Sequence, residues 1–241
     1  MSSALAAIEE KVYDDVPEID YESLITEDDQ PVDNIFSEKQ QRLLVEPLYS
    51  SWNPGTPFMA AANVGMYNSP YQPAIVPDMF LSLDVQPAED VWKKRNRCYF
   101  VWKFGKPPEV ALEIVSNKKG GETGNKFKKY AQIGVWYYII FDPQLCVQEN
   151  IVQVYQLSLG RFVLKDGFHL DQVNLGLTLW DGVFEGLDAQ WLRWCDAEGI
   201  LLPTGEEGRI QEHQRAEQEH QRVERLTAQL RALGVEPNNG G

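Results

Sequence analysis

The stretch that decides the fold, residues 109–143, reads EVALEIVSNKKGGETGNKFKKYAQIGVWYYIIFDP. Its two apolar runs, EVALEIV at 109–115 and VWYYIIFDP at 135–143, are typical of strands covered on both faces. Between them lie a loop rich in lysine and glycine and a helical segment at 125–134, which Gly134 is well placed to end. A strand, a loop, a helix and a second strand in this order predict a mixed sheet with a helix crossing over it.

Outside this unit the sequence predicts one further helix in the same domain. SEKQQRLLVEPLYSSW at 37–52 carries apolar residues at helical spacing, with Ser37 as the N-cap and Gln40 completing a capping box. The remaining segments predict strands and loops: DMFLSLDV at 78–85 as a strand, 88–106 as a charged loop or hairpin, 150–170 as a hairpin around Leu159–Gly160, and 175–203 as a terminal extension with turns and aromatic anchors.

The chain therefore divides into an acidic arm at 1–30, an α/β domain at 31–203 and a helical tail at 205–235. The tail repeats at seven residues, as EHQRAEQ followed by EHQRVER. Glu219 interrupts an otherwise apolar heptad seam. A solvated tail and a weak coiled coil that pairs two copies both stay open. The seam residues are Ala216, Val223, Leu226, Leu230 and Leu233.

The distribution of charge is uneven along the chain. The net charge of −14 argues against a general nucleic-acid binder, whose affinity comes from neutralising phosphates. Residues 93–129, however, hold eleven bases and three acids, a local +8. A solvated loop and helix face would explain such a run, and a surface that meets a polyanion is the sharper alternative.

Three widely spaced cysteines, Cys98, Cys146 and Cys195, fit neither a disulfide framework nor a CxxC metal site. Together with the absence of a long apolar run and of a signal-like N-terminus, they predict a cytoplasmic protein with no membrane partner.

The unusual residue of the central unit is Glu113, which lies inside an apolar strand. Alternation places it with Ala111 and Val115 on one face. A buried carboxylate must be paired, protonated or bound to a cation, and a salt bridge to a nearby lysine is the simplest solution. Asp78 follows a proline and starts the preceding clear strand. Two carboxylates that converge across adjacent strands would form a hard-oxygen site of the kind that Mg²⁺ prefers.

These residues resemble a known group. The order Pro77-Asp78, then Glu113-Ile114-Val115, then GETGNKFKKYAQIGVWYYIIFDP at 121–143, is similar to the PD-(D/E)XK nuclease superfamily. More narrowly, it resembles the bacterial Uma-two family of restriction-endonuclease-like proteins. The likeness covers roughly residues 20–235 and includes the early helix and the C-terminal segment.

The resemblance implies a restriction-endonuclease-like α/β core, with Asp78, Glu113 and the backbone carbonyl of Ile114 as ligands of Mg²⁺ or Mn²⁺. Val115 stands where the superfamily has its catalytic lysine, so Lys126 from the following helix is the candidate replacement. The frequent family histidine of the first helix is also missing, with Lys39-Gln40-Gln41 in its place. The residues expected to contact the phosphates of DNA are Lys118, Lys119, Lys128 and Lys129.

The leading hypothesis is a metal-dependent endonuclease that hydrolyses phosphodiester bonds of DNA by metal-activated water. The alternative is a catalytically inactive module that keeps the fold for binding or assembly, which Val115 and the acidic composition favour. An enzyme acting on a small phosphorylated substrate is a third, weaker hypothesis. A homodimer through the fold or the C-terminal helix stays open.

Overall fold

The computed structural model describes residue 20 and residues 34–116 and 122–233. The acidic arm predicted at 1–30 therefore lies, apart from Asp20, outside the described residues. The helices are α2 (Ile35–Ser51), α3 (Val101–Phe104), α4 (Phe127–Ile133) and α5 (Gly205–Ala232), with a 3₁₀ turn at Lys94–Asn96 and a π-helical turn at Glu122–Lys126.

A mixed six-stranded sheet forms the centre of the domain, in the order β1-β3-β5-β6-β7-β8. Only β5 and β6 run parallel within it, and the other neighbouring pairs are antiparallel. Its strands are β1 (Phe58–Ala62), β3 (Met79–Leu83), β5 (Val110–Ile114), β6 (Tyr137–Phe141), β7 (Val152–Ser158) and β8 (Arg161–Leu164). The smaller sheets consist of β2 (Met66–Tyr67) with β4 (Tyr99–Phe100), and of β9 (His169–Leu170), β10 (Leu175–Phe184) and β11 (Leu187–Cys195).

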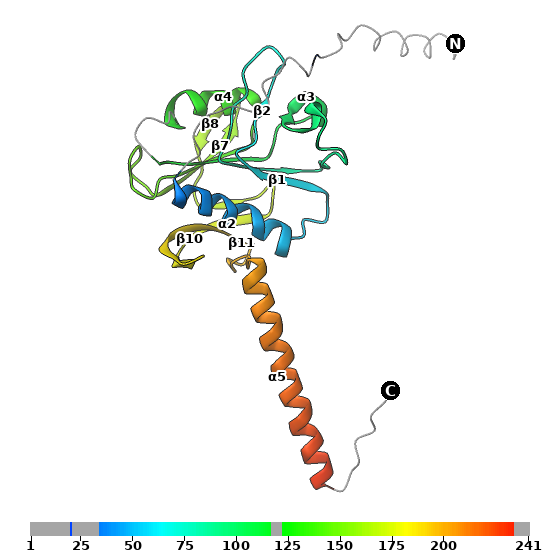
Figure 1. The fold of residues 1–241 in the computed structure, drawn as a ribbon. Coiled ribbons are helices and arrows are strands. Elements are labelled where there is room, and N and C mark those ends of the chain that lie inside the picture. The colour runs from blue at the N-terminus through cyan, green and yellow to red at the C-terminus, as the bar shows by residue number, and fades with distance from the viewer. Residues whose placement is uncertain (1–19, 21–33, 117–121, 234–241) are drawn as a thin grey trace, which may run out of the picture.

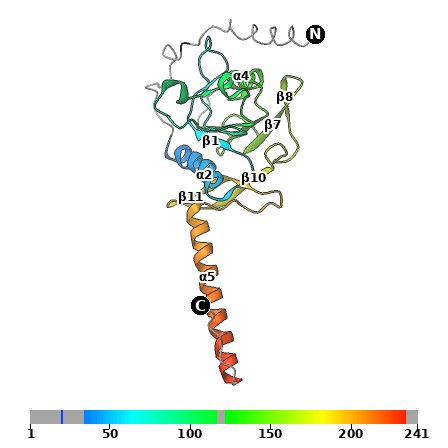
Figure 2. The same cartoon turned by 90° about the vertical axis from the view of Figure 1, so that its right-hand side faces the viewer.

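The main sheet is covered on both faces, which explains why its central strands are apolar throughout (Figures 1 and 2). Helix α2 and the hairpin of β10 and β11 cover one face, and α3 and α4 lie on the other. The alternation predicted for β5 is confirmed: Leu112 faces the core beneath α2, whereas Ala111 and Val115 face the core beneath α4. Glu113 shares the second face.

The central unit folds as its sequence predicts. The crossover from β5 to the parallel β6 passes through α4, which ends at Gly134 with a φ of +93°. A side chain at this φ is strained, so glycine is the residue that suits the helix end. The hairpin of β7 and β8 also turns at Leu159 and Gly160, both in the left-handed region.

Two expectations at the start of the domain are wrong. Asn34, not Ser37, caps α2, since its side chain accepts a hydrogen bond from the Ser37 amide at 3.0 Å. Gln40 does not complete a capping box; its amide instead pairs with both backbone groups of Leu192 in β11, at 2.8 and 2.9 Å. A long-range contact therefore takes over the side chain that local sequence assigned to the helix end.

The segment at 175–203 is more than an extension with turns. Strands β10 and β11 form a long antiparallel hairpin that turns at Glu185–Gly186. Trp191 and Trp194 are buried in it, and the Trp194 indole donates to the Leu44 carbonyl of α2 at 2.8 Å. The aromatic anchors were predicted, but they belong to a second sheet that closes the core.

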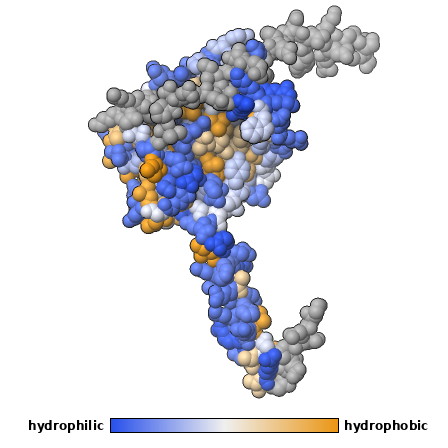
Figure 3. Space-filling model, in the orientation of Figure 1, coloured by the Kyte–Doolittle hydropathy of each residue, from blue (hydrophilic) through white to orange (hydrophobic). Residues whose placement is uncertain are grey.

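Helix α5 projects away from the domain, and polar residues cover most of it (Figure 3). A complete capping box of Thr204 and Glu207 starts it. Its seam residues Val223, Leu226, Leu230 and Leu233 are exposed, so pairing with a second copy stays a prediction. Nowhere in residues 34–116 and 122–233 does a helix combine the length and apolar character needed to cross a membrane.

Candidate active site

The strand register brings Asp78 to Glu113. Met79 pairs with Leu112 in the antiparallel β3–β5 ladder, and continuing this register by one step sets Asp78 opposite Glu113. Asp78 is only 9% exposed, and its Oδ2 accepts a hydrogen bond from the backbone amide of Ile114 at 2.6 Å. The two predicted acidic ligands thus lie together at the end of β5.

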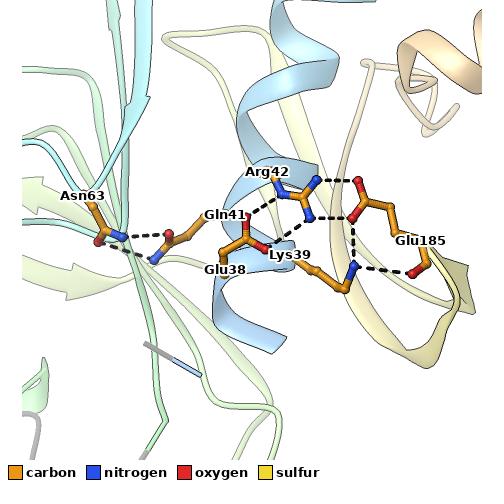
Figure 4. Close-up of polar contacts among 6 residues, drawn as sticks. All are labelled: Glu38, Lys39, Gln41, Arg42, Asn63 and Glu185. Atoms are coloured by element: carbon orange, nitrogen blue, oxygen red, sulfur yellow. Dashed lines mark hydrogen bonds and ion pairs between the residues drawn. The ribbon is translucent and has the colours of Figure 1, made fainter. Parts of the chain in front are cut away.

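Helix α2 supports Asp78 from the other side. The Gln41 side-chain amide donates to Asp78 Oδ1 and to Asn63 Oδ1, each at 3.4 Å. Asn63 returns a shorter bond to Gln41 Oε1 at 2.9 Å (Figure 4). Its own backbone amide donates to the Asp78 carbonyl. Gln41 lies in the Lys39-Gln40-Gln41 run that replaces the family histidine, so this run still contributes a side chain to the site.

The same helix turn holds the hairpin on its opposite side. Lys39 donates to Glu185 Oε2 at 2.8 Å, and the Arg42 guanidinium pairs with both Glu185 and Glu38 (Figure 4). Glu185 is at the β10–β11 turn. One turn of α2 therefore joins Asp78 to the second sheet.

Glu113 is the most deeply buried acid of the site, with 1% exposure. Its Oε1 accepts from the Tyr130 hydroxyl at 2.6 Å, and its Oε2 accepts from Lys126 Nζ at 2.7 Å. Lys126 ends the π-helical turn and Tyr130 lies in α4 one helical turn later, so both approach from the same helix face. The predicted lysine is thus in direct contact with the predicted metal ligand.

Burial is the largest influence on the Glu113 carboxyl, and the negative charge of Asp78 adds to it. Together they raise the pKa of Glu113 from 4.5 to about 8, although Lys126 and Tyr130 act in the opposite direction. Burial and the neighbouring Glu113 also raise the pKa of the Tyr130 hydroxyl well above 10. Tyr130 therefore keeps its own proton at neutral pH and donates a hydrogen bond to the Glu113 carboxyl group.

Val115 cannot supply the missing lysine function. Its side chain is 2% exposed and packs in the core beneath α4, and its amide donates to Phe141. Lys126 reaches the carboxylate from the following helix instead, with 31% of its side chain exposed. The Lys126 side chain therefore contacts Glu113 and is still partly exposed to solvent.

Of the four lysines predicted to contact DNA, Lys128 and Lys129 are exposed on α4, whereas Lys118 and Lys119 lie outside the described residues. Tyr130 and Gln41 were not predicted as site residues. The spacing of Lys126 and Tyr130, four residues apart on a helix, could have identified the tyrosine. No comparable local signal marks Gln41, because its partners are brought to it by the sheet.

The donor set suits a magnesium ion. Two adjacent carboxylates, both buried, repel one another, and a divalent cation would relieve that repulsion. Among the described residues no group of three or more histidine, cysteine or acidic side chains gathers to hold a metal. Two carboxylates and the Ile114 carbonyl would leave most of the shell to water, an arrangement that Mg²⁺ accepts. The residues therefore fit the ion that the sequence predicts.

Comparisons with known proteins found a match to one family model and to a solved structure. A family model described as "Uma2: Putative restriction endonuclease" matches residues 25–181, well over half of the chain. No curated protein matches. A crystal structure described as a "putative nuclease belonging to DUF820", from Anabaena variabilis ATCC 29413, is similar over 58% of this chain and 72% of its own, with 15% identity and a TM-score of 0.42. The family-model match spans the segment that carries Asp78, Glu113 and Lys126. The chain therefore belongs to the Uma2 family of restriction-endonuclease-like proteins.

Proposed function

We propose that this protein is a metal-dependent endonuclease that hydrolyses phosphodiester bonds of DNA. The contact that carries the proposal is the one between Glu113 and Lys126, next to Asp78. It places two carboxylates and a partly exposed ammonium at one strand end. Family membership supports nuclease chemistry in general, and the metal and the DNA substrate are our inference.

In this proposal Asp78, Glu113 and the Ile114 carbonyl would hold Mg²⁺, with Mn²⁺ as a substitute. When bound, the ion supplies a Lewis acid and a water of lowered pKa. The protein groups fix this donor set: the Ile114 amide and Gln41 orient Asp78, and Tyr130 orients Glu113. Such hydrogen bonds keep the carboxylates in position before substrate arrives.

Lys126 carries positive charge beside the carboxylates. Its ammonium can orient the attacking water or stabilise the negative charge that develops on the phosphate oxygens. The lysines on the exposed face of α4, Lys128 and Lys129, would contact neighbouring phosphates, as would Lys118 and Lys119, which precede them in the chain. These contacts would add affinity without joining the chemistry.

Incubation of the purified protein with plasmid and oligonucleotide DNA tests the proposal, with Mg²⁺, Mn²⁺ or EDTA present. Cleavage that requires the metal is the expected result. Uncut DNA with both metals would favour the inactive binding module instead.

Metal binding should be visible without activity. At a Mg²⁺ concentration about one hundred times Kd, binding stabilises the folded state by about 2.7 kcal/mol. For a chain of this size that corresponds to a rise in Tm of roughly 5–10 °C. Asp78→Asn should abolish the rise measured by differential scanning calorimetry, whereas Asp84→Asn, an exposed aspartate after the same strand, should preserve it. An equal rise in Asp78→Asn would remove Asp78 from the ligand set.

Replacing Lys126 with alanine is expected to lower kcat for DNA cleavage by about 10²-fold or more, as loss of a positioned acid–base or charge-stabilising group does. Lys128→Ala, from the same helix, is the matched control and should change mainly KM and its salt dependence. Steady-state kinetics at several salt concentrations separate the two effects. A Lys126→Ala protein with wild-type kcat would contradict this assignment.

A further inference from the structure

A second candidate site lies at the start of the base-rich run at 93–129, just before Lys93. The segment that follows β3 exposes a tryptophan, Trp92, with 81% of its surface accessible. Helix α3 comes soon after it in the chain and lies on the same side of the main sheet as α4 (Figure 1). A large aromatic side chain in this position buries little area within the domain, so most of its surface is available to a ligand.

Although its indole is exposed, the backbone of Trp92 is held on both sides. Its amide donates to Asp90 Oδ1 at 3.1 Å, and its carbonyl accepts from Arg97 Nε at 3.2 Å. Asn96 fastens the same turn, donating to the Asp90 carbonyl and accepting from Lys103. The exposed indole therefore projects from a turn whose backbone is fixed by hydrogen bonds.

Beside Trp92 the surface forms a hollow of about 500 Å³ lined by Lys93, Arg95, Asn96 and Lys103. Glu89 and Asp90 also line it, but Asp90 is engaged by the Trp92 amide and by Lys93 at 3.4 Å. From residue 93 to residue 106 the chain has six bases and no acid. Three bases and two acids thus line the hollow, and Trp92 lies in the chain between Asp90 and Lys93, two of its lining residues.

The cations of this hollow are crowded. Lys103 Nζ donates to the Arg95 carbonyl at 3.1 Å, which brings the two residues together. Burial, and then the positive charge of Arg95, lower the pKa of the Lys103 ammonium. Like charges held this close repel one another, and an anion in the hollow would relieve the repulsion.

We propose that Trp92 and this hollow bind an unpaired stretch of a nucleic-acid strand, with a base stacked on the indole and its phosphate beside Lys93, Arg95 and Lys103. The inference rests on the proposed function and deepens it, because it makes a strand with unpaired bases the preferred substrate. Aromatic platforms combined with cationic grooves are how proteins bind single strands without reading their sequence.

Nucleic acid fits this surface better than an acidic peptide does. Carboxylates would meet the lysines and the arginine equally well, but an acidic peptide gives the exposed indole nothing to stack on. Every nucleobase has a flat face, and base–aromatic stacking adds affinity at each stacked base. A duplex keeps its bases stacked within the helix, so its phosphates would contact the cations but no base would stack on Trp92.

The test is fluorescence anisotropy of the full-length protein in EDTA, where cleavage is blocked. The probes are a fluorescein-labelled 20-mer of thymidine, a 20-base-pair duplex and a 20-mer of uridine. We expect tighter binding of the single strands and about a tenfold loss for Trp92→Ala. Trp92→Phe should keep most of the affinity, and Trp136→Ala, which removes an exposed tryptophan just before β6, should keep all of it.

The charges are tested by salt titration. Lys93→Ala/Arg95→Ala should lower the slope of log K against log salt by about 1.4 for a single strand. Arg215→Ala/Arg222→Ala on α5 removes the same charge and should leave the slope unchanged. The uridine arm shows which sugar is preferred, and Trp92-dependent binding of either strand supports the inference.

Equal binding of Trp92→Ala and wild type to both single strands would overturn the inference, and so would equally effective competition by poly-glutamate. These outcomes are separate from the fate of the proposed function. If the protein cleaves DNA with metal but Trp92→Ala leaves binding unchanged, only the inferred preference for unpaired strands is wrong. If Trp92 binds single strands and no metal supports cleavage, the binding site is confirmed and the proposed nuclease activity is wrong.

Discussion

Glu113→Gln should abolish metal-dependent DNA cleavage, with a loss on the order of a thousandfold, and still give a well-folded protein. Glutamine has nearly the same shape: its amide oxygen can accept from Lys126 and its NH2 group can donate to the Tyr130 hydroxyl oxygen, so the fold keeps both local contacts. It cannot offer the ion a carboxylate, and electrostatic stabilisation of the reacting phosphate is lost with the metal. The matched control is Glu109→Gln, just before the other end of β5, which should cleave DNA at close to the wild-type rate.

The same variant has an unusual stability profile. In the metal-free protein the pKa of Glu113 is about 8, against an ordinary value of 4.5. The folded state therefore keeps a proton that the unfolded chain has lost between pH 4.5 and pH 8, and wild-type stability falls across this interval. Glu113→Gln lacks this titration, so its stability advantage should grow up to about pH 8 and then level off.

Urea unfolding in EDTA at pH 5, 7 and 9 measures this difference. A Glu113→Gln protein that is less stable than wild type at pH 9 would show that the ion pair with Lys126 outweighs the cost of burying the charge. That result would contradict the raised pKa while leaving the ligand assignment open to the cleavage assay.

The largest purely structural effect is expected at the foot of α5. Arg193 is 2% exposed, and its guanidinium forms two bonds to Glu207, at 2.9 and 2.6 Å, and one to the Leu202 carbonyl. It also lies over the Trp180 ring at 4.8 Å. Glu207→Ala leaves this buried cation without its partner and removes half of the capping box. We expect a destabilisation of about 3–5 kcal/mol.

The neighbouring Glu206→Ala is its matched control. Glu206 pairs with Arg209 on the exposed face of the same helix turn, where solvent screening leaves an ion pair little effect on stability. Thermal or urea unfolding of the two variants compares a buried and an exposed partner at adjacent positions. Equal effects of the two substitutions would mean that Arg193 finds other partners when Glu207 is gone.

The parts of the fold that were predictable are those determined by nearby residues. The central unit was read from its apolar runs, its glycine and its lysine-rich loop, and Lys126 was predicted because it lies in the helix that follows Glu113. Gly134 ends α4, and Leu159–Gly160 turns a hairpin, because left-handed backbone has a local signature. At these positions the short-range pattern and the tertiary structure agree.

What escaped prediction depends on distant partners. Gln40 and Trp194 bridge α2 and β11 across about 150 residues, and no pattern near either residue points to the other. The hairpin of β10 and β11 was underestimated for the same reason, since its apolar residues face a core built by α2 and the main sheet. Gln41 is a site residue only because that packing brings it to Asp78.

The short part of α2 that contacts Glu185, Leu192 and Asp78 limits how far the chain can be truncated without loss of the fold. The family match ends at residue 181, but partners of Gln40 and Leu44 lie beyond it, in β11. A fragment trimmed to the match would leave the Gln40 amide unpaired and expose the core side of α2, next to the residue that orients Asp78. The smallest fragment that keeps this core intact therefore has to continue through Leu202, whose side chain is part of the same core.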